Sequence, residues 1–173
     1  MAKLSICSAS IILWVLFLCV KPIASQQSIE NLCAKAIDKN FCLQVLAPSP
    51  SQSLDDLLKT AVANAATNAL LTSTKIQEQL TEPNSPDLTV AYFQCSNYYS
   101  AGRGSVRRRA SQRLGSSPAA EVVNDVASAA STVEKDADFC EASFKNGASR
   151  ILSSDNRTLK LSSNVIKVVC AAI

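Results

Sequence analysis

The stretch CAKAIDKNFC, residues 33–42, places two cysteines on either side of an Asp-Lys-Asn turn. Paired cysteines serve as metal ligands, as a redox couple or as a structural disulfide. A zinc site needs C-x₂₋₄-C pairs or histidines, and a redox motif needs C-x-x-C; neither occurs here, and the chain has no histidine. We therefore predict a Cys33–Cys42 disulfide that staples a helical hairpin over residues 28–47. Closing a loop of this length contributes about 2–3 kcal/mol.

Upstream of the hairpin, residues 1–25 have the layout of a secretory signal peptide. Lys3 precedes the apolar run IILWVLFLCV at 11–20, and Ile23-Ala24-Ser25 is a plausible cleavage site. The run is too short to span a bilayer, which takes about 20 residues. We predict cleavage to a single domain of residues 26–173 with no membrane segment. Loss of Lys3 and Lys21 lowers the net charge from +3 to +1, so the overall charge indicates no partner.

Downstream of the hairpin, the apolar periodicity is helical throughout. Ser53 with Asp56 three residues later, and the pairs Ser85-Pro86 and Ser117-Pro118, are typical helix starts, and Asp155 is a further candidate cap. The predicted long helices cover 54–81, 86–114, 118–145 and 156–172. Because their linkers are short, we predict an all-α fold: an antiparallel up-down-up-down four-helix bundle over 54–173, preceded by the stapled hairpin.

The cysteines left after leader removal are Cys33, Cys42, Cys95, Cys140 and Cys170. In an exported chain this number suggests two disulfides and one free thiol. Cys95 and Cys140 fall on the core stripes of neighbouring antiparallel helices at similar levels, so a Cys95–Cys140 bond is geometrically reasonable. Cys170 is then the free thiol, and we expect it to be buried.

The absence of histidine removes the Ser–His and Cys–His dyads and the commonest general base. No pair of carboxylates stands out as an acid–base couple. We predict that the chain is not an enzyme and that it uses no cofactor and no metal.

Three polar features remain. Arg103, Arg107, Arg108, Arg109 and Arg113 form a basic run that suits an acidic polysaccharide, an acidic protein cleft or simply a solvated helix face. A nucleic-acid partner conflicts with the signal peptide. Asn156-Arg157-Thr158 is an N-glycosylation sequon, expected to lie exposed at the start of the last helix. Tyr98 and Tyr99 are candidate contact residues, although Tyr99 lies on the core stripe.

The ordered pattern of these motifs resembles the plant invertase and pectin methylesterase inhibitor family. The motifs are Ile29-x-x-x-Cys33, Cys42-x-x-x-Leu46, Cys95-x-x-x-Tyr99, ASAA at 127–130, Cys140-Glu141-x-x-Phe144 and LSSNVI at 161–166. The resemblance implies a helical hairpin before a four-helix bundle, disulfides Cys33–Cys42 and Cys95–Cys140, and a free last cysteine. It also implies a secreted inhibitor that forms a one-to-one complex over the active site of a cell-wall pectin methylesterase or an acid invertase.

The choice between these targets depends on one turn. Invertase inhibitors of this family carry Pro-Lys-Phe there, and the matching residues are Pro118, Ala119 and Ala120, which lack the cation and the aromatic ring. We therefore predict a pectin methylesterase inhibitor of the apoplast, with acidic pectin as a further possible contact. The alternatives are an inhibitor of cell-wall or vacuolar invertase, and a non-inhibitory helical module that binds a cell-wall polymer or a peptide. Arg103 departs from the apolar residue that is usual in the family.

Overall fold

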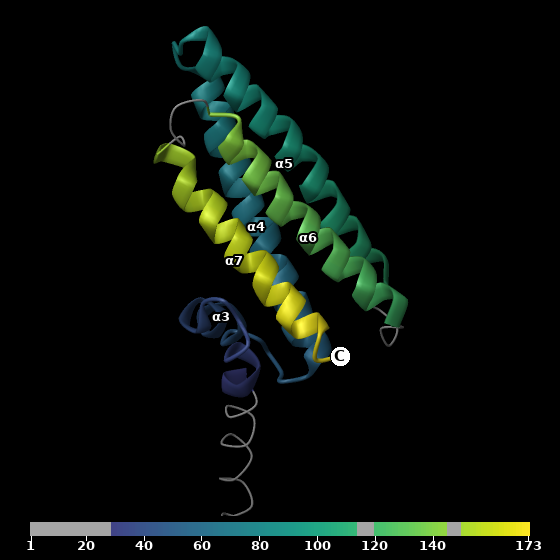
Figure 1. Cartoon of the computed structure of the whole chain (residues 1–173). Coiled ribbons are helices and arrows are strands. Elements are labelled where there is room, and N and C mark those ends of the chain that lie inside the picture. The colour runs from purple at the N-terminus through teal and green to yellow at the C-terminus, as the bar shows by residue number, and fades with distance from the viewer. Residues whose placement is uncertain (1–28, 114–119, 145–149) are drawn as a thin grey trace, which may run out of the picture.

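The computed structural model describes residues 29–113, 120–144 and 150–173, with side chains except at 101–113, Ala120 and Arg150. Its helices are α3 (Lys39–Leu46), α4 (Leu54–Thr81), α5 (Pro86–Arg113), α6 (Ala120–Ala142) and α7 (Arg150–Cys170), and no strand occurs in these ranges. The long helices α4 to α7 run alternately up and down and lie side by side (Figure 1). The predicted all-α four-helix bundle is confirmed.

The bundle holds together because each long helix buries one apolar stripe. Each helix packs against two neighbours, in the order α4, α5, α6, α7 and back to α4. Small side chains make up much of this core, which lets the helices approach closely. The fully or almost fully buried side chains of the stripes include Leu57, Leu58, Ala61, Ile76, Tyr99, Val126, Ala130, Ala137, Leu152, Leu159, Ile166 and Val169.

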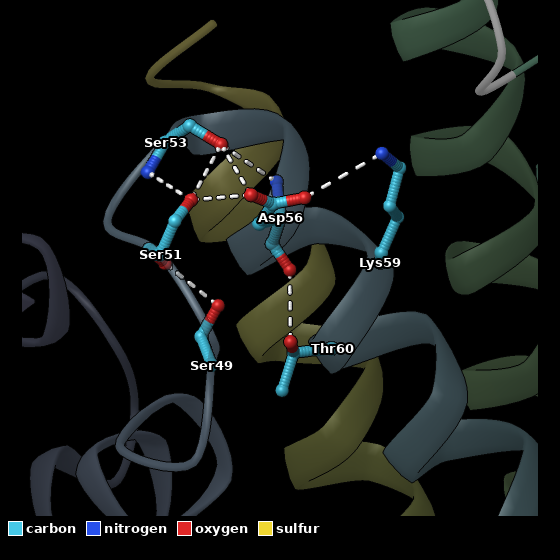
Figure 2. A network of polar contacts seen from close by, with 6 residues as sticks. All are labelled: Ser49, Ser51, Ser53, Asp56, Lys59 and Thr60. Atoms are coloured by element: carbon cyan, nitrogen blue, oxygen red, sulfur yellow. Dashed lines mark hydrogen bonds and ion pairs between the residues drawn. The ribbon is translucent and has the colours of Figure 1, made fainter.

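The start of α4 is capped as its sequence predicts. Ser53 Oγ accepts the backbone N–H of Asp56 at 3.2 Å and donates to the Asp56 carboxylate at 3.0 Å. Ser51 adds a second hydroxyl donor to the same carboxylate, and Lys59 lies 3.5 Å from it (Figure 2). The hydroxyls of Ser51 and Ser53 hold the pKa of Asp56 below its usual value. The cap therefore also anchors the linker that leaves the hairpin.

The N-terminal hairpin consists of a helical turn at 29–33 followed by α3. Asp38 caps α3 by accepting the Phe41 N–H at 3.0 Å, so this helix begins at Lys39. The predicted Cys33–Cys42 disulfide closes the hairpin with its Cα atoms 5.5 Å apart. The hairpin packs only against α4 and α7 among the described elements and leaves α5 and α6 uncovered (Figure 1).

The last helix differs from the prediction, because α7 already includes Arg150 and its predicted cap, Asp155, lies inside it. Leu152 is fully buried and extends the apolar stripe of α7 by two turns ahead of Leu159. The Asp155 carboxylate instead accepts hydrogen bonds from Lys75 of α4, at 2.8 and 2.9 Å. Tertiary packing thus overrides a local sequence that resembles a helix start.

A smaller difference concerns α6, which ends at Ala142 rather than at 145. α5 is described up to Arg113, and its predicted end at Leu114 lies outside the described residues. The predicted start of the third long helix at Ser117-Pro118 lies outside the described residues, as does the signal peptide. None of the described helices is long and apolar enough to cross a membrane.

Candidate protein–protein interface

A stacked pair of aromatic rings lies between α5 and α6 on the side that the hairpin leaves uncovered. The rings of Tyr98 and Phe139 have centroids 5.5 Å apart and planes inclined by 28°. Phe139 is 54% exposed, although it is one of the largest apolar side chains of the bundle. Aromatic side chains are enriched at the energetic centres of protein interfaces because they bury much area at little entropic cost. This pair is the centre of the candidate interface.

A disulfide fixes the spacing of the two helices at the level of this pair. It joins Cys95 of α5 to Cys140 of α6, with Cα atoms 4.6 Å apart, and both cysteines are fully buried. Tyr98 follows Cys95 by three residues and Phe139 directly precedes Cys140. Because the covalent link lies next to the rings, α5 and α6 cannot slide past each other there. The pair is therefore presented in a preorganised position.

Charged side chains lie near Phe139 along α6 and on the neighbouring helix α7. Lys160 of α7 pairs with Asp138, the neighbour of Phe139, and also lies 3.5 Å from Glu141. The hydrogen bond with Asp138 is the main cause of the raised pKa of Lys160. An apolar centre with a charged, solvent-accessible rim is typical of a protein-binding surface.

Further exposed apolar side chains lie along the first half of α5. Leu88, Val90 and Phe93 are 40%, 56% and 59% exposed. Elsewhere, Leu70 and Leu71 of α4 and Ile37 of the hairpin are also exposed, so exposure alone does not mark an interface. The stacked contact across α5 and α6 distinguishes Tyr98 and Phe139 from these residues.

Beneath the aromatic pair lies a buried polar contact between α5 and α7. The Tyr99 hydroxyl donates a hydrogen bond to Asn156 Oδ1, and Asn156 Nδ2 lies 4.0 Å from the Cys140 sulfur. Tyr99 is 2% exposed and Asn156 1%. Burial and nearby carboxylates, Asp136 first among them, raise the pKa of Tyr99, so the phenol stays protonated and donates. Tyr99 is a core residue, whereas Tyr98 faces the surface.

The burial of Asn156 corrects the expectation that the sequon is exposed. The expectation placed Asn156 at the first turn of the last helix, but the described α7 already includes Arg150, six residues earlier. Asn156 therefore lies in the second turn, on the stripe that includes Leu152 and Leu159. The remaining predicted thiol, Cys170, is unpaired and buried, and burial raises its pKa to about 11. Such a thiol is an inert core side chain at neutral or acidic pH.

The part of the chain that the structure describes contains no group of three or more His, Cys, Asp or Glu residues able to hold a metal ion. A small cavity of about 10 Å³ lies between α4, α6 and α7, and alanines form much of its lining. The described residues thus form a rigid helical scaffold with an exposed aromatic pair.

Comparison with known proteins agrees with this geometry. The family model described as plant invertase/pectin methylesterase inhibitor matches residues 27–168. The chain belongs to this family. No curated protein matches the sequence significantly. Members of the family are protein inhibitors rather than enzymes, and they are generally extracellular.

Two crystal structures of pectin methylesterase inhibitors from Arabidopsis have the same fold. The first, a mutant form, superposes with a TM-score of 0.70 at 18% identity and covers 84% of this chain and 96% of its own. The second, from Arabidopsis thaliana, has a TM-score of 0.61 at 20% identity, with 84% and 95% covered. At such identities the likeness shows the fold and leaves the target enzyme open.

In this chain, the described part of the position that corresponds to the invertase-inhibitor tripeptide lies far from the aromatic pair. Pro118 and Ala119 lie outside the described residues, and Ala120 is the first residue of α6. Ala120 and Phe139 are separated by 19 residues of one helix, which is about 28 Å at 1.5 Å per residue. The two candidate contact regions therefore lie near opposite ends of α6.

The arginine run lies at the same end of the bundle as Ala120. Arg103, Arg107, Arg108, Arg109 and Arg113 occupy the last three described turns of α5, and Arg113 is its last described residue. A cation in the last turn of a helix interacts favourably with the helix dipole, and of this run Arg113 lies nearest to that end. Contact between this run and acidic pectin stays a prediction.

Sequence reasoning missed Phe139, Lys160 and Asp138 as members of one surface. Phe139 directly precedes the core residue Cys140, and an aromatic residue next to a stripe position is the signal that was available. The Cys95–Cys140 bond sets the register between α5 and α6. Because Tyr98 lies almost one turn after Cys95, this register brings Tyr98 close to Phe139.

Proposed function

We propose that this protein is an inhibitor of pectin methylesterase that forms a one-to-one complex with the enzyme and covers its active-site cleft. The contact surface would be centred on Tyr98 and Phe139. The protein would be secreted by way of the signal peptide at 1–25 and would act in the apoplast. This proposal goes beyond the family assignment, which names two classes of target enzyme.

The observation that carries the proposal is the exposed aromatic pair beside the Cys95–Cys140 bond. A rigid, preorganised surface loses little conformational entropy on binding, so an apolar centre of this kind can support a stable complex. Pectin methylesterase inhibition would use this helical face and needs no tripeptide. The chain lacks the lysine and phenylalanine that an invertase inhibitor inserts, since Ala119 and Ala120 follow Pro118.

Titration of the mature protein, residues 26–173 with both disulfides formed, into purified pectin methylesterase and acid invertase tests the proposal. The measurement is residual activity at pH 5–6 against inhibitor concentration, with the complex sized by light scattering. We expect pectin methylesterase activity to fall to its minimum at one inhibitor per enzyme, with invertase unaffected. Loss of invertase activity alone would favour the second target, for which the retained Pro118 is the supporting feature. Loss of neither would support a non-inhibitory binding module.

A further inference from the structure

The sequence contains one N-glycosylation sequon, Asn156-Arg157-Thr158, and the fold places its acceptor in the core. A glycan is bulky and soluble and is tolerated on surface residues. Asn156 is instead 1% exposed, within a helix that packs against both α4 and α6. The acceptor side chain is thus inaccessible in the folded protein.

Both polar atoms of the Asn156 amide face protein atoms. Oδ1 accepts the hydroxyl of Tyr99, which is itself 2% exposed. Nδ2 lies 4.0 Å from the Cys140 sulfur, and Cys140 is bonded to Cys95. The amide therefore satisfies a buried donor and packs against the disulfide that joins α5 to α6.

Glycosylation would change the same nitrogen. The transfer forms a bond between Nδ2 and the anomeric carbon of a lipid-diphosphate-linked oligosaccharide; the bond from that carbon to the phosphate oxygen breaks, the lipid diphosphate leaves, and one amide proton goes to solvent. A carbon–nitrogen single bond is about 1.45 Å long. The first sugar would therefore occupy space that the Cys140 sulfur and the helix packing hold in the native bundle.

We infer that folding and N-glycosylation compete for the Asn156 side chain: the secreted, folded protein carries an unmodified Asn156 that accepts the Tyr99 hydroxyl, and a chain glycosylated there cannot form the native α5–α6–α7 packing. A chain that folds slowly is then glycosylated at Asn156 more often and fails to reach the native fold. This inference is independent of the target enzyme.

Secretion of the full chain from a eukaryotic host tests the inference. The secreted and retained protein would each be analysed by intact mass, by glycosidase digestion and by labelling of free thiols at Cys95 and Cys140. We expect secreted chains to be disulfide-bonded and free of glycan, and any glycosylated chains to be retained with those two thiols free. Secreted protein with a glycan on Asn156 and an intact Cys95–Cys140 bond would overturn the inference.

Two matched variants show whether a missing glycan results from burial of Asn156 or from inefficient glycosylation by the host. Thr158→Ala removes the sequon and leaves Asn156 in place. The hydroxyl that it removes donates a hydrogen bond of 2.9 Å to the Ser154 carbonyl, one turn back in the same helix. This variant should be secreted at least as well as the wild type, with the same melting temperature. Adding Ile151→Asn creates a sequon with Ser153 on the same helix, at a position that is 50% exposed. That double variant should be secreted, glycosylated and folded, and its lack of a glycan would contradict a role for burial.

A change of folding rate tests the competition itself. Brief treatment of the cells with a membrane-permeable reductant prevents both disulfides from forming and keeps Asn156 accessible for longer. We expect the glycosylated fraction of wild-type chains to rise several-fold. The glycosylated fraction of the double variant, whose exposed sequon is at position 151, should change little. An unchanged wild-type fraction would show that folding and modification do not compete.

Discussion

The backbone N–H of Ile37 donates a hydrogen bond of 2.9 Å to Oδ1 of Asn164, and so links the turn of the N-terminal hairpin to α7. Apolar side chains on both sides of the hairpin, Ile29, Leu32, Val45 and Leu46, belong to the same core as the bundle. The hairpin is thus held by an apolar contact, one polar contact and the Cys33–Cys42 bond. These contributions can be separated by mutation.

Removal of the hairpin disulfide by Cys33→Ala with Cys42→Ala should loosen the hairpin and leave α4 to α7 folded. The expected loss is about 2–3 kcal/mol, because the open loop gains conformational entropy in the unfolded chain. Hydrogen exchange followed by mass spectrometry is the measurement. Amides of 29–46 should lose most of their protection, and those of α4 to α7 should keep theirs.

Asn164→Ala provides the control for this prediction. Ile37 is 74% exposed, so its N–H can bond to water when the Asn164 oxygen is removed. We expect a loss of no more than about 1 kcal/mol. If the double cysteine variant instead lost protection throughout the bundle, the hairpin would be an integral part of one cooperative unit.

Two neighbouring serines in α7 provide a second, internally controlled prediction. Both are 1% exposed. Ser162 Oγ donates to the Thr158 carbonyl at 2.9 Å and accepts from Asn68 of α4 at 3.0 Å. Ser163 Oγ has no hydrogen-bond partner among the described residues and lines the 10 Å³ cavity together with Ala66 and Ala130.

Ser162→Ala should lower the free energy of unfolding by about 1–2 kcal/mol, because it leaves the partly buried Asn68 amide with one partner fewer. Ser163→Ala should raise that free energy by about 1 kcal/mol, since an unsatisfied buried hydroxyl is removed. Urea denaturation of both variants measures the difference. Equal destabilisation by the two substitutions would mean that Ser163 has a partner, such as a buried water.

The start of α7 shows where sequence reasoning succeeds and fails. Long apolar stripes predicted the existence and order of all the long helices, because burial of such a stripe is a strong and periodic signal. The boundary was wrong because Ser153-Ser154-Asp155 resembles a helix cap, whereas the burial of Leu152 decides the outcome. The same shift of one boundary moved Asn156 from the surface into the core.

The candidate interface was only partly predictable for a similar reason. Tyr98 was named from the sequence, and its proximity to Phe139 depends on the register between α5 and α6. The ion pairs of Lys160 with Asp138 and of Lys75 with Asp155 depend on side-chain positions across helices. Single-sequence periodicity contains no information about such pairs.

A third prediction concerns pH and Asp136 in α6. Its side chain is buried, Oδ2 has no hydrogen-bond partner within the described ranges, and loss of solvation raises its pKa above the usual value. The folded state therefore keeps the Asp136 proton to a higher pH than the unfolded chain does. The resulting stabilisation is fully present below the unfolded pKa, about 3.9, and is lost as the pH rises through the folded pKa.

Asp136→Asn removes this titration and should make the protein more stable than the wild type at pH 7. The measurement is the free energy of unfolding of both proteins in urea at pH 4, 5, 6 and 7. The advantage of the variant should grow with pH, by about 1.4 kcal/mol for each unit of pKa difference between the folded and unfolded states. Comparison at each pH cancels the opposite contribution of Asp56, whose pKa is lowered. A difference that is constant over this range would contradict the prediction.

The fourth prediction concerns binding by the aromatic pair. Phe139→Ala and Tyr98→Ala should each weaken the complex with pectin methylesterase by about 2 kcal/mol or more, which is roughly 30-fold in Kd, as expected for aromatic residues at the centre of an interface. Residual enzyme activity against inhibitor concentration gives the Kd. Because Phe139 is 54% exposed, its removal should leave the melting temperature almost unchanged.

Leu70→Ala is the matched control for this binding prediction, since Leu70 is 49% exposed but lies on α4. It should leave the Kd within about twofold of the wild-type value, because single exposed apolar side chains outside an interface contribute nothing to binding. Equal weakening by Leu70→Ala and Phe139→Ala would move the contact surface away from α5 and α6. Full inhibition by a folded Tyr98→Ala, Phe139→Ala double variant would exclude the aromatic pair as its centre, whichever enzyme is the target.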